Sequence, residues 1–245
     1  MAESPSGAPP ALSVVIPAFD EEANVEPCYR ELVGVLETHG QSFEIVFVDD
    51  GSTDGTLGIL RHLAGVDSRV RVLRLRRNSG QTAALDAGFR AARAPIIVTM
   101  DADLQNDPHD IPRLLSALPG QDAVCGWRVD RHDPWTKRIA SRVANAVRDR
   151  VTADGVHDTG CTLKAFRREA VQRLHLYRGM HRFLPALLQM EGMRVTELPV
   201  SHRPRRAGVS KYGNWRRLWT GLADLWAVRW MARRRLDYQI EDEGR

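Results

Sequence analysis

The sequence IIVTMDADLQ at residues 96–105 joins an apolar run to a set of polar side chains, and it determines how the rest of the chain is interpreted. Residues 95–100 have the composition of a buried β-strand. Similar runs occupy residues 12–16, 43–48 and 70–75, and segments with helical spacing separate them at residues 22–37, 56–64 and 81–92. Strands that alternate with helices in this way predict an α/β fold, with a mostly parallel sheet flanked by helices.

The second half of the chain alternates less regularly. We expect helices at residues 111–118, 135–151, 170–174 and 183–190, and strands at residues 123–125, 163–166 and 195–200. The interpretation is one domain over residues 12–212, preceded by a disordered arm at 1–11. An amphipathic helix at 213–236 and a tail at 237–245 follow it.

Acidic side chains follow the first, second and fourth expected strands. Ligands of open parallel sheets bind at the carboxyl ends of the strands, so these positions are candidate site residues. Asp101 and Asp103 are two residues apart in extended chain and therefore point to the same side, and Gln105 continues the series. Carboxylate and amide oxygens suit Mg²⁺ or Mn²⁺. An acidic loop that only caps the next turn is the alternative.

The other two strand ends carry residues that suit a nucleotide. Asp50 can accept a hydrogen bond from a nucleobase, Phe19 can stack on a base, and Glu21 can hold a ribose hydroxyl. Each segment taken alone is also explained by turn and capping chemistry.

Three motifs in this order resemble family-2 glycosyltransferases of the GT-A fold: VVIPAFDEE at 14–22, FVDDGSTDGT at 47–56 and TMDADLQ at 99–105. The resemblance covers about residues 12–212. It is strongest to dolichyl-phosphate mannosyltransferases and bacterial polyprenyl-phosphate glycosyltransferases, which share the further motifs NSGQTAA at 78–84, GWR at 126–128, R-x-x-S-x-x-x-N at 138–145, DTGCTLK at 158–164 and RRAGVSKY at 205–212.

The resemblance implies inverting transfer of a sugar from GDP-mannose or a UDP-sugar to a polyprenyl phosphate. It also implies a role for each matching residue. The donor would be held by Pro17, Phe19, Glu21, Val48, Asp50, Asp101, Ala102, Asp103, Arg205 and Lys211, with Phe19 standing where Tyr is usual. The metal, Mg²⁺ or Mn²⁺, would be held by Asp101, Asp103 and Gln105. The acceptor phosphate would be bound by Arg128, Arg138 and Ser141, with Asp158 near the reacting centre.

Two acceptor chemistries remain open at this point. A phosphate is already an anion near neutral pH, so it needs no general base, and Asp158 would orient a sugar hydroxyl or an acceptor-site arginine. A hydroxyl acceptor needs a base, and Asp158 would be the candidate. A non-catalytic, membrane-associated binding protein is a third hypothesis. A nucleic-acid binder is disfavoured because the positive charge is local and no recognition motif is present.

The C-terminal region concentrates the positive charge. Ten Lys or Arg residues lie between residues 202 and 235 against a single acid, Asp224, so the rest of the chain is net acidic. Four tryptophans recur there at helical spacing: Trp215, Trp219, Trp226 and Trp230. Trp on one helix face with Arg around it is typical of a membrane-interface helix, and a helix packed on the domain with Trp in the core is the alternative.

Location is predicted from what the sequence lacks. The N-terminus has no basic region followed by an apolar run, and no run of 18 or more apolar residues occurs. Three widely spaced cysteines indicate neither zinc nor disulfides. We therefore expect a cytoplasmic protein, peripheral on the cytoplasmic face of a membrane, that meets its lipid through a membrane surface or a membrane-embedded partner.

Overall fold

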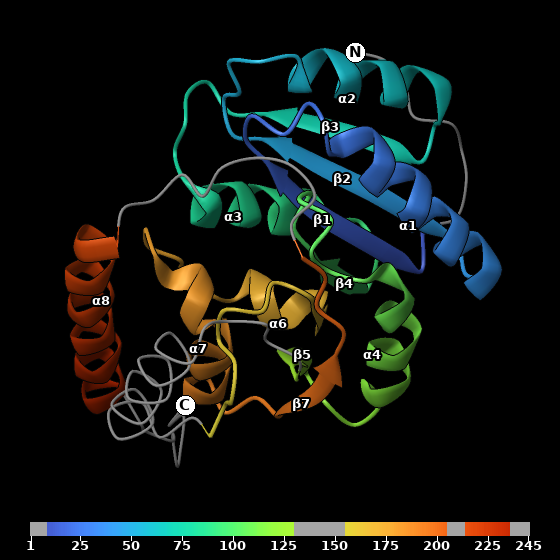
Figure 1. The fold of residues 1–245 in the computed structure, drawn as a ribbon. Helices are drawn as coiled ribbons and strands as arrows, with labels where there is room; N and C mark the ends of the chain where they lie inside the picture. The colour runs from blue at the N-terminus through green and yellow to red at the C-terminus, as the bar shows by residue number, and fades with distance from the viewer. Residues whose placement is uncertain (1–8, 130–154, 205–213, 236–245) are drawn as a thin grey trace, which may run out of the picture.

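The computed structural model describes residues 9–129, 155–204 and 214–235. Within them a seven-stranded sheet runs in the order β3-β2-β1-β4-β6-β5-β7 (Figure 1). The strands are β1 (Leu12–Ala18), β2 (Phe43–Asp49), β3 (Val70–Arg74), β4 (Ile96–Thr99), β5 (Ala123–Arg128), β6 (Lys164–Arg167) and β7 (Val195–Val200). All of them coincide with or overlap the strands expected from the apolar runs.

The sheet is mostly parallel, as predicted. β1 pairs in parallel with β2 and β4, β2 with β3, and β5 with β7. The exception is β6, which is antiparallel to both β4 and β5. Because β6 links the two parallel groups, the ends of β4 and β5 reach a common edge of the sheet.

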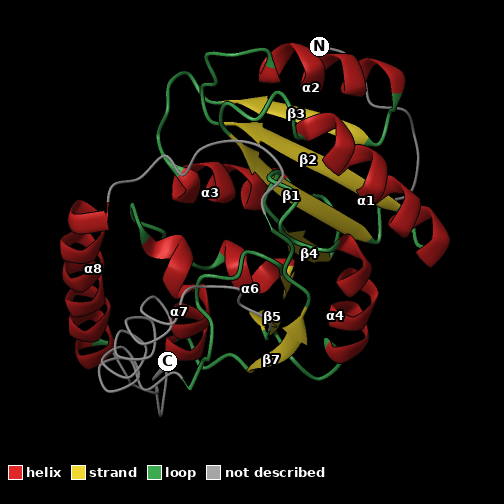
Figure 2. Ribbon diagram, viewed as in Figure 1, coloured by secondary structure: helices red, strands yellow, loops and turns green. Residues whose placement is uncertain are grey.

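Helices flank the sheet on both faces (Figure 2). They are α1 (Val25–His39), α2 (Thr56–Val66), α3 (Gln81–Ala91), η1 (Pro108–Asp110), α4 (Ile111–Ala117), α6 (Arg168–Gln172), η2 (Met180–Phe183), α7 (Leu184–Met190) and α8 (Asn214–Arg234). The first helix begins three residues later than predicted, because residues 19–24 form a turn in which Asp20 has φ +49°. The helix expected at 135–151 lies outside the described residues.

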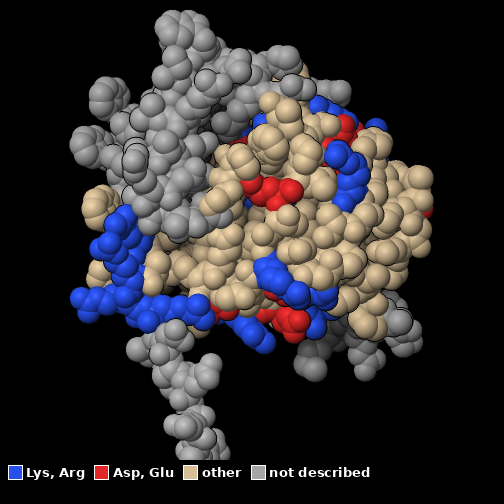
Figure 3. All heavy atoms as spheres, turned by 90° about the horizontal axis from the view of Figure 1, so that it is seen from below, with Lys and Arg blue, Asp and Glu red and all other residues tan. Residues whose placement is uncertain are grey.

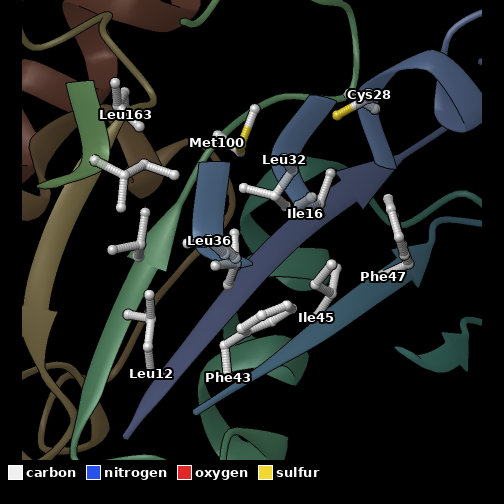
Figure 4. Packing of buried hydrophobic residues seen from close by; sticks show 14 of the residues in the cluster. Leu12, Ile16, Cys28, Leu32, Leu36, Phe43, Ile45, Phe47, Met100 and Leu163 are labelled. Carbon is white, nitrogen blue, oxygen red and sulfur yellow. The ribbon is translucent and has the colours of Figure 1, made fainter. Parts of the chain in front are cut away.

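Apolar side chains point alternately to the two faces of the sheet and form two cores, one on each face. Leu12 and Ile16 of β1 pack in the same cluster as Leu32 and Leu36 of α1 (Figure 4). Val15 points to the opposite face, into a second cluster with residues of α3, α6, α7 and α8, since successive side chains of a strand face opposite ways. The cores therefore fix the sheet between two helical layers.

One glycine lets α3 approach the sheet. A Cβ on Gly88 would lie 2.2 Å from Cγ1 of Val15, far inside van der Waals contact. The Ala-rich composition of α3 and this glycine bring its N-terminus close to the carboxyl ends of β1 and β4.

The structure tests one of the two interpretations of the C-terminal region, that of a helix packed on the domain with Trp in the core. It packs on the domain through Leu225 and Val228, which are buried in the second core. Trp226 and Trp230 are 66% and 63% exposed, so the alternative with these tryptophans in the core is wrong. The side chains of Trp215 and Trp219 lie outside the described part.

Candidate functional site

A cavity of about 380 Å³ opens at the carboxyl edge of the parallel strands, within the size range of small-molecule sites. Residues at or just after the carboxyl ends of β1, β2, β4 and β5 contribute to its wall, together with the start of α3, the segment before β6, and η2. The lining residues are Pro17, Ala18, Phe19, Glu21, Asp50, Asn78, Gln81, Ala84, Asp101, Ala102, Asp103, Gln105, Arg128, Gly160, Thr162, His181 and Arg182. The carboxyl ends of several strands therefore share one pocket, as the acidic strand ends predicted.

The acidic side of the cavity is built by the turn that follows β4. Gln81 Nε2 donates to Asp101 Oδ1 at 2.8 Å, and the backbone N–H of Gln105 donates to Asp103 Oδ1 at 3.1 Å. Leu104 has φ +62°, so this turn uses the left-handed conformation at a non-glycine residue. Asn106 Oδ1 accepts the Asp101 N–H at 3.1 Å, and these bonds aim the two carboxylates into the cavity.

The electrostatics of this turn suit a divalent cation. Burial and the neighbouring charge of Asp103 raise the pKa of Asp101 to about 7, against the opposing effect of Lys164 and Arg128. Two neighbouring carboxylates, one buried and one half-buried, destabilise each other's charged form, and a bound cation removes that penalty. With the amide of Gln105 beside them, the oxygen set fits Mg²⁺ or Mn²⁺.

A second acidic group lies elsewhere and is explained differently. Carboxylate and imidazole atoms of Glu31, Asp107 and His109 all lie within 4.8 Å of one another. Arg203, however, donates to Glu31 at 2.6 Å and to Asp107 at 2.7 Å. Because a guanidinium already neutralises both carboxylates, this group is accounted for as an ion-pair network.

The nucleoside side is organised by Asp50 and the turn after β1. Asp50 is 4% exposed, and its two oxygens accept the backbone N–H groups of Ser79 and Gly80 at 2.7 and 2.8 Å. The backbone N–H of Glu21 donates to Thr56 Oγ1 at 2.7 Å, so the turns after β1 and β2 are bonded together. Asp50 thus holds the loop before α3 as well as lining the cavity.

Among the predicted donor residues that the structure describes, Val48 is the one that is not part of the cavity wall. Its side chain is fully buried in the second core, because strand alternation directs it toward α3. A contact of Val48 with the nucleoside stays a prediction, and its buried side chain leaves the backbone as the part that could make it.

Arg128 and Asp158 form a buried bidentate pair beside the acids. Nε of Arg128 lies 2.6 Å from Asp158 Oδ2, and Nη2 lies 2.9 Å from Oδ1. The two side chains are 17% and 7% exposed. Burial opposes the charged form of Arg128, but the Asp158 carboxylate raises its pKa above the ordinary value. Asp158 therefore orients an arginine, which is one of the roles expected from the sequence.

The acceptor and loop residues Arg138, Ser141, Arg205 and Lys211 lie outside the described residues. In the other direction, the structure adds cavity residues that carried no predicted role, among them Asn78, Gln81, Gly160, Thr162, His181 and Arg182. Asn78 and Gln81 belong to a motif that the sequence displayed. His181 and Arg182 had no signal beyond two basic residues between apolar ones.

The outer surface of α8 is aromatic and basic. Beyond the exposed Trp226 and Trp230, residues Arg233, Arg234 and Arg235 are exposed at the end of the helix. Lys and Arg side chains gather along one border of the face seen from below (Figure 3). Among the described residues, no helix has both the length and the apolar character that crossing a bilayer requires.

Comparison of the sequence with known proteins identifies the family of the chain and several relatives. The model of the family described as glycosyl transferase family 2 matches residues 13–174. The chain is 41% identical over 208 residues to a dodecaprenyl-phosphate galacturonate synthase from Rhizobium johnstonii, covering 82% of the chain and 62% of the relative. It is 39% identical over 204 residues to an undecaprenyl-phosphate 4-deoxy-4-formamido-L-arabinose transferase from Edwardsiella ictaluri, covering 82% and 63%. The chain thus spans less than two thirds of these relatives.

Solved structures show the same fold at low identity. Glucosyl-3-phosphoglycerate synthase from Mycobacterium tuberculosis, in complex with Mn²⁺, UDP-glucose and phosphoglyceric acid, matches with a TM-score of 0.68 at 19% identity, covering 93% of this chain and 81% of that one. A mannosyltransferase from Pyrobaculum calidifontis, in complex with GDP-mannose and Mn²⁺, matches with a TM-score of 0.65 at 23% identity, covering 95% and 66%. These neighbours confirm the predicted GT-A fold.

Proposed function

The chain belongs to glycosyltransferase family 2, and from that premise we propose that it transfers a sugar from a nucleotide-diphosphate sugar to a polyprenyl phosphate, with inversion at the anomeric carbon. The observation that carries the proposal is one cavity that holds both an acidic pair, Asp101 and Asp103, and a fixed arginine, Arg128. Such a cavity suits two phosphorylated molecules that meet at one carbon. The relatives named for lipid-phosphate sugar transfer support the same acceptor class.

The donor is proposed to lie along the edge from β2 to β4. Phe19, Glu21 and Asp50 border the part that suits the nucleoside, with Pro17 and Ala102 completing its wall. Asp101, Asp103 and Gln105 would hold Mg²⁺ or Mn²⁺, which supplies neutralisation of the leaving diphosphate when bound. Arg205 and Lys211 are proposed as further donor-phosphate ligands on the strength of their motif. GDP-mannose and UDP-sugars both remain donor candidates.

The acceptor is proposed to bind at Arg128. A guanidinium suits phosphate through its bidentate geometry, and Asp158 keeps it in one orientation. An oxygen of the lipid phosphate attacks the anomeric carbon as the bond to the diphosphate oxygen breaks, and the nucleoside diphosphate leaves. Arg138 and Ser141 are proposed to share this phosphate, again from their motif.

The pairing of Asp158 favours phosphate over a hydroxyl acceptor. A hydroxyl must lose a proton to a base, whereas a phosphate monoester is already an anion near neutral pH, since its second pKa is about 6. Both oxygens of Asp158 accept from Arg128. A carboxylate in that state is poorly placed to take a proton from substrate.

The exposed face of α8 is proposed to rest on an anionic lipid surface. Trp226 and Trp230 present aromatic rings there, and Arg233 to Arg235 present positive charge. Aromatic rings settle at the interface, and each basic residue contributes about 1 kcal/mol on an anionic leaflet. This contact would keep the enzyme peripheral at the membrane where its lipid acceptor lies.

A transfer assay tests the proposal. The protein is incubated with Mn²⁺ or Mg²⁺, a polyprenyl phosphate and each member of a panel of UDP- and GDP-sugars. We expect a lipid-linked sugar from at least one donor, and a loss of at least a hundredfold in Asp103→Asn. Glu26→Gln, an exposed acid on α1, is the control and keeps wild-type activity. Transfer to an alcohol but to no lipid phosphate would contradict the acceptor, and full activity in Asp103→Asn would contradict the metal site.

A further inference from the structure

We infer that Arg182 is an additional acceptor-phosphate ligand and that Asp224 of α8 positions it. The inference rests on the proposed function and extends it, because neither residue belongs to a motif shared with the family resemblance. It assigns η2 to the acceptor side of the cavity. It also makes α8 part of the site rather than only a surface for lipid.

The turn η2 presents two basic side chains to the cavity. Met180 and Phe183 are each 6% exposed and anchor the turn in the second core. His181 and Arg182, between them, are half-buried and line the same cavity as Asp101 and Arg128. Because its neighbours in η2 are anchored in the core, the Arg182 backbone is fixed and its guanidinium stays close to the cavity wall.

η2 is fixed to the start of α3 by hydrogen bonds. Thr82, which is 5% exposed, has Oγ1 2.7 Å from His181 Nδ1 and accepts the backbone N–H of Gly179 at 3.0 Å. Gly179 has φ +89°, a conformation that favours glycine. Gln81, the neighbour of Thr82 at the start of α3, donates a hydrogen bond to Asp101. The N-terminal end of α3 therefore contacts both the segment that carries Arg182 and the proposed metal-binding turn.

α8 touches this turn through its only acid. A Cβ built on Gly179 would lie 2.5 Å from Asp224 Oδ2, so the carboxylate sits against the η2 backbone. Burial raises the pKa of Asp224, and the positive charge of Arg182 works against that rise. The attraction between this carboxylate and Arg182 favours one placement of the guanidinium, and Leu225 and Val228 fix the helix that carries Asp224.

Charge explains why the site needs another arginine. Arg128 already shares its charge with Asp158 in a bidentate pair. Two phosphorylated substrates bring several negative charges into one small cavity, and a second guanidinium lowers the repulsion between them. The wall that carries Arg182 is also the wall in contact with α8.

Binding measurements test the inference without requiring turnover. Calorimetry gives the dissociation constant of farnesyl phosphate, with farnesol as the phosphate-free control, on protein loaded with Mn²⁺ and UDP. The dissociation constant of UDP with Mn²⁺ is measured in parallel. We expect Arg182→Gln to weaken farnesyl phosphate at least tenfold and UDP less than twofold. Arg178→Gln, an exposed arginine of the same segment that is not among the cavity residues, changes neither.

Asp224→Asn separates positioning from direct contact. It is expected to weaken farnesyl phosphate about threefold, to raise the acceptor KM with little change in kcat, and to leave Tm within about 2 °C of wild type. Equal farnesyl phosphate binding by Arg182→Gln and wild type would overturn the inference alone. Equal weakening of UDP would move Arg182 to the donor side and also overturn it. Failure of wild type to bind farnesyl phosphate would overturn the proposed acceptor, and the inference with it.

Discussion

The pair of Arg128 and Asp158 offers the most exact prediction, because its geometry and burial define the effect of breaking it. A double-mutant cycle uses Arg128→Gln, Asp158→Asn and the double variant. Either single change leaves one charge without its partner at a site where the two side chains are only 17% and 7% exposed. Removing one partner of a buried pair costs about 3–5 kcal/mol, and removing both costs much less than the sum.

The magnitude follows from the remaining contacts. Asn and Gln keep part of the hydrogen bonding, and Arg128 is not fully buried, so each single variant is expected to lose about 3 kcal/mol of unfolding free energy. We therefore expect a coupling energy of at least about 2 kcal/mol between the two positions. The matched control is the pair of Arg30 and Glu26, which is as short at 2.5 Å but 73% and 46% exposed. Its coupling is expected below about 0.5 kcal/mol.

Urea denaturation followed by circular dichroism measures all of these free energies, and the pH profile of kcat is recorded for Asp158→Asn. If Asp158 orients Arg128, the acceptor KM rises and the shape of the pH profile is unchanged. A coupling energy near zero at this pair would refute the structural reasoning. A profile that loses its acidic limb in Asp158→Asn would show that the carboxylate acts as a general base.

Three further predictions test packing, charge and surface. Gly88→Ala is expected to lose about 1–3 kcal/mol of stability from overpacking, whereas Gly34→Ala, with open space around its added Cβ, gains about 0.5–1 kcal/mol in the same denaturation assay; equal effects would contradict the close packing of α3. Hydrogen bonds from Arg69 lower the pKa of Asp67 to about 2. The contribution of Asp67 to stability is therefore fully present above the ordinary carboxyl pKa and is lost as pH falls through about 2, so Asp67→Asn is expected to cost about 1–2 kcal/mol at pH 7 and much less at pH 2. Replacing Trp226 and Trp230 by Ser is expected to weaken sedimentation with anionic vesicles at least fivefold without changing Tm, and unchanged sedimentation would remove α8 as the lipid contact.

Much of the fold could be predicted because the information is local. Near-continuous apolar runs indicate buried parallel strands, and segments with a hydrophobic period of 3.6 residues indicate the helices between them. This part of the sequence analysis is confirmed. The antiparallel direction of β6 had no comparable signal. Its pairing with β4 and β5 depends on the path of the chain between them, which hydrophobicity alone does not specify.

The site was predictable where a motif and a strand end coincide. Asp101 and Asp103 lie in the cavity as their spacing indicated. Val48 does not line it, because a side chain at that position of a strand faces the core. The bond between Arg128 and Asp158 joins positions 30 residues apart, and such a pairing follows from tertiary structure, although the sequence allowed it as one of three roles for Asp158.

α8 shows how helical spacing can be correct while its orientation is ambiguous. The tryptophan stripe suited either a core or an interface, and the deciding contact is made by Leu225 and Val228 on another face of the helix. When a helix has two apolar faces, the face that is buried can be identified only once the surface against which the helix packs is known.

A crystal of the protein grown with a nucleotide-sugar and Mn²⁺ is the most direct test of the central claim. An anomalous difference map locates the manganese without reference to the expected site. The account predicts one peak bonded to carboxylate oxygens of Asp101 and Asp103, with the diphosphate on its open side. Manganese held instead at Glu31, Asp107 and His109, with the first two carboxylates turned away from the diphosphate, would contradict it.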